Sequence, residues 1–65
     1  MKTKYSVTDS QGRTHTRTTE RTYTNVVVAE KDTRLNTCWC GRPDLAQKEA
    51  ARWRAHGWTA EIVTV

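Results

Sequence analysis

Residues 41–57, GRPDLAQKEAARWRAHG, decide the fold of this chain because they predict its helix. Pro43 suits the first turn of a helix, and Asp44-Leu-Ala-Gln47 matches an Asp-x-x-Gln capping box. Good helix formers continue as far as His56, and Gly57 stands where a C-terminal glycine cap belongs. We therefore expect a helix from Asp44 to His56.

The predicted helix has one apolar side, which must pack against another element. On a wheel of 3.6 residues per turn, that side consists of Leu45, Ala46, Ala50 and Trp53. A second set of side chains, Lys48, Arg52 and Ala55, flanks Ala51 on the back of the helix. This strip is a candidate docking surface for a partner protein or a second copy of the chain, although any solvated helix back has a similar composition.

The segments on both sides of the helix have the alternation of strands. Tyr5 to Asp9 alternates, and Asp9 to Gly12 has the composition of a tight turn, so a first hairpin is expected. Its second arm begins at Arg13 and runs to about Thr19. After the helix, Trp58 to Val65 alternates as a closing strand.

The middle of the chain leaves two arrangements open. Thr22 to Ala29 contains three consecutive valines, which favour a strand. Residues 13–29 are compatible with one long bent strand and with two separate strands. Glu30 to Thr37 has the polar composition of a loop, and Thr37 to Trp39 is expected to add a short extended piece.

These elements predict a single compact α+β domain over residues 1–65, in the order β-β-(β)-α-β. It would contain a small, mainly antiparallel sheet of three to four strands, with one helix packed on one face. In this arrangement Trp53 and the helix alanines are buried against Tyr5, Val7, alternate valines of 26–28 and Ile62. The other face of the sheet is expected to be polar and open.

Composition narrows the class of protein. The chain has 65 residues, three tryptophans and no phenylalanine, so its core is small, and folding as a homodimer would enlarge it. Its net charge is +4, and residues 1–21 alone carry +3. Such asymmetry suits nucleic acid or an acidic partner, and it also serves solubility. No membrane span or signal peptide is evident, which predicts a cytosolic protein without membrane contact.

The run RTHTRTTERTYT, residues 13–24, is the main candidate for a functional surface. In an extended strand, alternate side chains share a face. The basic and aromatic face would carry Arg13, His15, Arg17, Arg21 and Tyr23, and threonines would form the other. Arginine and tyrosine can bind single-stranded nucleic acid by phosphate contact and stacking. The same alternation is also typical of a solvated sheet surface.

No pattern indicates catalysis or a cofactor. Cys38-x-Cys40 has the wrong spacing for a structural zinc site, and His15 and His56 lack the close pairing of zinc ligands. The chain has no evident nucleophile beside a base and no glycine-rich phosphate loop. We therefore expect no metal, no cofactor and no enzyme activity.

Three segments resemble a group of short, uncharacterised proteins of actinobacterial phages, including mycobacteriophages. They are Tyr5-x-Val7-Thr8-Asp9-x-x-Gly12-x-x-His15-x-Arg17, Arg21-x-Tyr23-Thr24-x-Val26-Val27-Val28 and Trp39-Cys40-Gly41-Arg42-Pro43-Asp44-Leu45-Ala46, and they cover most of the chain. Asn25 departs from a histidine in the group's Tyr-Thr-x-Val segment, which argues against a shared metal or acid-base role. The resemblance implies an accessory phage protein of the host bacterial cytoplasm and supplies no activity.

The sequence thus predicts a small basic binding protein, with three hypotheses for its partner. The leading one is nucleic acid, bound through the basic strand face. The second is a host protein, bound by a phage-encoded modulator through the same face or the helix back. The third is a second copy of the chain, in a small structural or assembly component.

Overall fold

The computed structural model describes residues 1–65 and contains five strands and one helix, in the order β-β-β-β-α-β. The elements are β1 (Thr3–Thr8), β2 (Thr14–Thr19), β3 (Asn25–Lys31), β4 (Arg34–Cys40), α1 (Pro43–Ala55) and β5 (Thr59–Thr64). β1 and β2 form an antiparallel hairpin, and the other strands form a separate antiparallel sheet in the order β4-β3-β5. The predicted α+β class, with one helix packed on an antiparallel sheet, is confirmed.

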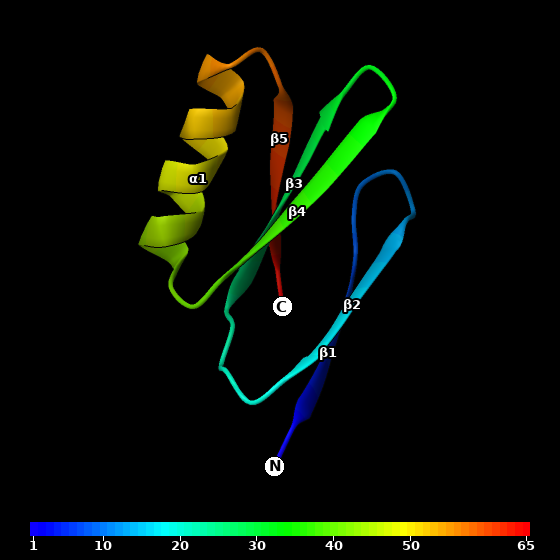
Figure 1. The fold of residues 1–65 in the computed structure, drawn as a ribbon, viewed down its shortest axis with the longest axis vertical. Coiled ribbons are helices and arrows are strands. Elements are labelled where there is room, and N and C mark those ends of the chain that lie inside the picture. Colours follow the sequence, from blue (N-terminus) through cyan, green and yellow to red (C-terminus); the bar gives the residue numbers. More distant parts are fainter.

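The three-stranded sheet lies between α1 and the hairpin (Figure 1). Its side chains alternate between these two neighbours, as the pleat requires. On the helix side, one buried cluster consists of Val27, Cys40, Ala46, Ala50 and Ala60. Trp53 and Ile62 are half-buried against this cluster. The predicted packing of the helix alanines and Trp53 against a valine and Ile62 is therefore confirmed.

The second face of the sheet is apolar and covered, which corrects the expectation of an open polar face. Val26 pairs with Trp39 on β4 and with Val63 on β5, so all three side chains point to the same side. Val26 and Val28 form a buried cluster there with Val7 of the hairpin. Tyr5 and Val7 therefore pack opposite the helix, because the hairpin folds over the sheet instead of extending it.

Polar contacts hold the hairpin in this position. The backbone N–H of Ser10 donates to Glu61 Oε1 at 2.9 Å, and the Ser10 hydroxyl donates to Glu61 Oε2. Arg13 Nη1 donates to Glu30 Oε2 at 2.9 Å. These hydrogen bonds fix the turn of the hairpin to β5 and β3. Val7 is buried between the hairpin and the sheet.

Of the two arrangements that the sequence leaves open for residues 13–29, the structure has two separate strands. Two other local expectations are corrected. The expected loop over Glu30–Thr37 is instead the end of β3, a tight turn and the start of β4. Asp32 in this turn has φ 55°, a conformation that aspartate tolerates. The capping box is not formed, because Arg42 is the N-cap and makes no side-chain cap bond. Gly57 has φ +84°, as a C-terminal glycine cap requires.

Candidate nucleic-acid interface

The basic strand face does not form one exposed surface. Val7 pairs with His15 and Tyr5 pairs with Arg17, so these four side chains point to the same side of the hairpin. That side faces the three-stranded sheet. Arg13 and His15 are half-buried, while Arg17 is exposed. Position on the strand thus divides the predicted basic face into an inner part and an outer part.

The inner part is an ion cluster centred on Asp9, whose side chain is 1 % exposed. Arg13 Nε donates to Asp9 Oδ2 at 2.9 Å, and His15 Nε2 lies 2.8 Å from the same oxygen. The backbone N–H groups of Gln11 and Arg13 donate to Asp9 Oδ1 at 2.9 and 3.0 Å. The positive charge of Arg13 is therefore paired with the buried Asp9 and with Glu30 at the surface.

These contacts perturb the ionisation of the cluster. Burial opposes the charged form of Asp9, but the hydrogen bonds from His15, Arg13 and Gln11 outweigh it, so its pKa lies well below the usual range. The hydrogen bond to Glu30, against a smaller opposing effect of burial, raises the pKa of Arg13, and Asp9 adds to the rise. Arg13 and His15 therefore stabilise the hairpin turn and are poor candidates for phosphate contacts.

The outer part of the face lies beside three packed aromatic rings, Tyr5, Tyr23 and Trp39, which we call the aromatic corner. Their centroids are 5.6 to 6.2 Å apart in tilted and edge-to-face arrangements. The guanidinium carbon of Arg17 lies 5.6 Å from the Tyr23 ring centroid, within cation–π range. Tyr5 connects the corner to the β2–β3 loop, because its hydroxyl donates to the Arg21 carbonyl at 3.2 Å.

Arg21 is exposed on that loop, at the edge of a surface hollow of about 380 Å³. Tyr23 and Trp39 also line this hollow, together with residues that include Cys38, Cys40, Leu45 and Glu49. Neither Arg17 nor Arg21 is in an ion pair. Two free guanidinium groups therefore lie next to partly exposed aromatic rings.

The threonines of β2 form the outer face of the hairpin. Thr14, Thr16 and Thr18 are exposed, and each is paired in register with an exposed residue of β1, respectively Thr8, Ser6 and Lys4. The predicted separation of threonines from basic residues is therefore present, but the threonine side is the one that faces solvent. Val7 packs against the apolar sheet beneath the hairpin, and His15, which pairs with Val7, therefore points to the same side.

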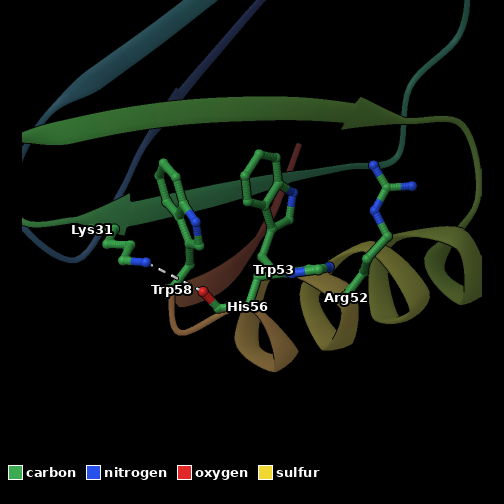
Figure 2. Close-up of a pocket in the computed structure, with 5 residues that line it drawn as sticks. All are labelled: Lys31, Arg52, Trp53, His56 and Trp58. Atoms are coloured by element: carbon green, nitrogen blue, oxygen red, sulfur yellow. Dashed lines mark hydrogen bonds between the residues drawn. The ribbon is translucent and has the colours of Figure 1, made fainter.

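The two residues of the second candidate surface, Lys48 and Arg52, lie in different surroundings. Lys48 is exposed and lines no hollow, whereas Arg52 lines a second hollow of about 380 Å³ together with Lys31, Trp53, His56 and Trp58. Figure 2 shows the two indole rings side by side between α1 and the strands, with Arg52 on one flank and Lys31 on the other. We call this site the tryptophan hollow.

The two cysteines lie on the helix side of β4 and are free thiols. Their Sγ atoms are 3.9 Å apart. Burial, with a further contribution from Cys38, raises the pKa of Cys40 to about 11, so this thiol is protonated and inert near neutral pH. No group of three or more His, Cys, Asp or Glu side chains is placed to hold a metal ion.

The sequence does not indicate Trp39, Trp58 and Lys31 as site residues. Trp39 and Trp58 belong to predicted strands, and no local pattern distinguishes a fully buried strand tryptophan from a half-exposed one. Lys31 belongs to a predicted loop, far in sequence from the helix end that it contacts. The one available signal was the abundance of tryptophan in a short chain with little other apolar bulk.

Comparison with known proteins adds no functional information. No protein-family model matches the chain, and no match was found among curated proteins or solved structures. The likeness to phage proteins therefore stays a prediction. α1 is neither long nor apolar enough to cross a bilayer.

Proposed function

We propose that this chain is a non-enzymatic accessory protein, working in the cytoplasm of a bacterial host, that binds single-stranded nucleic acid. One observation carries the proposal: Arg17 and Arg21 are free of ion pairs and flank the partly exposed rings of the aromatic corner. Free cations beside aromatic faces are the combination that binds phosphates and stacks bases without sequence preference.

The binding surface that we propose is narrower than the predicted basic strand face. Arg17, Arg21, Tyr23 and Trp39 form it, while Arg13 and His15 support the hairpin from within. Bases would stack on Tyr23 and Trp39, and the two arginines would bind the phosphates between them. The overall charge of +4 adds long-range attraction to any polyanion.

The test is a salt titration of binding to a short labelled oligonucleotide, single-stranded and duplex, followed by fluorescence anisotropy. Log affinity should fall linearly with log salt, because bound phosphates release counterions. Arg17→Ala and Arg21→Ala should each reduce the slope by about one ion. Tyr23→Leu should weaken binding to the single strand by about 1–3 kcal/mol through lost stacking.

Lys48→Ala is the matched control, since it removes another exposed cation without an ion pair, from the back of α1. It should leave the salt slope unchanged. Equal effects of Lys48→Ala and Arg17→Ala would show that only diffuse charge attracts the ligand. Absence of binding at low salt would refute the proposal altogether.

A second function, binding of a host protein, is favoured by the position of β4. This strand lies at the edge of its sheet, so one row of its backbone N–H and C=O groups has no strand partner. An extended peptide can add to such an edge as a further strand. A pull-down from nuclease-treated host lysate should then retain one stoichiometric protein, and retention of nothing would argue against this function.

A further inference from the structure

The tryptophan hollow has a lining that suits one class of ligand. Its five lining residues are two tryptophans and three basic residues, and no carboxylate is among them. The indole centroids of Trp53 and Trp58 are 4.8 Å apart at an interplanar angle of 64°. Both rings are half-buried, so part of their apolar surface faces the hollow. A ligand with one flat apolar part and one anionic part matches this lining.

The exposure of the two indoles is costly for so small a domain. The side chains that are fully buried in the core are valines and alanines, and the largest of them are Val26 and Val27. Burying a large aromatic ring would contribute far more, because the hydrophobic free energy grows with the apolar area removed from water. The fold nevertheless leaves Trp53 and Trp58 partly open at the end of the helix. A ligand that covers them would complete this burial.

The charges around the indoles favour an anion. Arg52 is exposed and pairs with the half-buried Glu49 at an N–O distance of 3.8 Å. So long a contact at the surface is weak, and Arg52 is therefore available to a ligand. Lys31 Nζ lies 3.5 Å from the carbonyl oxygen of His56, at the negative end of α1. Lys31 thereby offsets the carbonyl dipoles that would otherwise repel an anion. Arg34 pairs in register with Lys31 and adds a cation at the same end of the sheet.

We propose that the tryptophan hollow binds one nucleotide unit, with the base against the exposed indole surface and the phosphate at Arg52 and Lys31. A volume of about 380 Å³ lies at the lower end of the range for ligand pockets, which suits one base with its sugar and phosphate. The unit is either a free nucleoside monophosphate or the terminal nucleotide of a strand. The choice of a nucleotide over other flat anionic ligands rests on the proposed function. The existence of the site rests only on its own geometry and charges.

The test uses ¹⁵N-labelled protein, in which each tryptophan gives a separate indole N–H signal. Titration with adenosine 5′-monophosphate should shift the signals of Trp53 and Trp58 in a saturable way. The two signals should follow one binding curve, independent of any shift of Trp39, which reports on the aromatic corner. Adenosine and inorganic phosphate should each bind more weakly, since each supplies half of the recognition. No shift at millimolar nucleotide, or equal shifts with adenosine, would overturn the inference.

Variants then assign the contacts. Arg52→Ala should weaken nucleotide binding by about tenfold, as expected for the loss of one charge-assisted hydrogen bond. Lys48→Ala, one turn earlier on the exposed back of α1, should change nothing. Equal losses in the two variants would show that only net charge matters and would contradict the site.

Two further arms identify the source of the ligand and separate this inference from the proposed function. Oligonucleotides with a 5′-phosphate should bind more tightly than those without one if a strand terminus occupies the hollow, and equally if free nucleotide is the ligand. Arg17→Ala should weaken oligonucleotide binding without altering the nucleotide shifts. Intact oligonucleotide binding with an inert hollow would refute this inference and leave the proposed function standing.

Discussion

At the scale of single residues, Asp9 determines which basic side chains near the start of β2 are held in internal contacts. Its carboxylate is buried beside Arg13 and His15, and it accepts hydrogen bonds from both side chains and from two backbone N–H groups. A buried carboxylate of this kind is stable only while these partners remain in place. Arg13 and His15 therefore stabilise the hairpin turn. Of the predicted basic face, only Arg17 and Arg21 remain without an ion pair.

The pKa of Asp9 makes stability depend on pH. The pKa of Asp9 is lower in the folded chain than in the unfolded chain, where it is about 3.9, so ionised Asp9 stabilises the fold at pH values above about 3.9. This stabilisation is lost as the pH falls from about 3.9 toward the folded pKa. We expect the free energy of unfolding, measured in urea, to fall as the pH is lowered from about 5. Asp9→Asn should be less stable at neutral pH, and its difference from the parent should narrow in acid.

Asp32→Asn is the matched control, because it removes an exposed turn carboxylate that makes no ion pair. It should retain the acid dependence of the parent. Parallel curves for Asp9→Asn and the parent would contradict the assignment of this dependence to Asp9.

At the scale of elements, the hairpin acts as a cover for the three-stranded sheet. Val7 is 6 % exposed although β1 lies in a separate, two-stranded sheet, because it packs on Val26 and Val28. α1 protects the opposite face through Ala46 and Ala50. The central sheet is thus covered on both faces, and the hairpin and helix each depend on it for their burial.

Removal of the Val7 side chain should therefore loosen the hairpin. Val7→Ala is expected to lower the free energy of unfolding by about 1.5–3 kcal/mol, since it exposes apolar surface and leaves a cavity. Thr16→Ala, on the solvent side of the same hairpin, should change it by less than about 0.5 kcal/mol. Chemical denaturation measures both values. Equal effects would mean that the hairpin does not pack on the sheet.

At the scale of the whole molecule, two hollows lie along α1, one near its N-terminal end and one at its C-terminal end. The first contains Leu45 and Glu49 beside the aromatic corner, and the second contains Arg52 and His56 beside the tryptophan pair. Both combine aromatic rings with free or weakly paired cations.

The hairpin covers a face of the sheet that the sequence predicts to be open and that a second copy of the chain could otherwise cover. Deletion of residues 1–21 should restore that face, because it exposes Val26, Val28, Trp39 and Val63. We expect the truncated chain to bind a hydrophobic dye and to self-associate in sedimentation experiments, while the full chain does neither. A truncated chain that stays monomeric and binds no dye would show that the hairpin is dispensable.

Local sequence patterns are sufficient to predict the helix, its glycine cap, the first hairpin and the closing strand. These features depend on short-range patterns: helix formers between Pro43 and Gly57, a turn after Asp9, and alternation after Trp58. Polar composition misled at residues 30–37, because a two-residue turn between strands has the same residue types as a loop. The net positive charge and the three tryptophans are also evident from composition, and they are compatible with a binding surface.

Which of the candidate residues are exposed depends on packing between elements. Alternation assigns side chains to two faces, but it does not say which face another element will cover. Here the sheet buries Val7, and the register then turns Arg13 and His15 inward toward Asp9. In the tryptophan hollow, Lys31 contacts the end of α1, which is far from it in sequence, and no local pattern predicts this contact. The geometry of the hollow depends on how α1 lies across the sheet, and the packing of side chains between them determines that orientation.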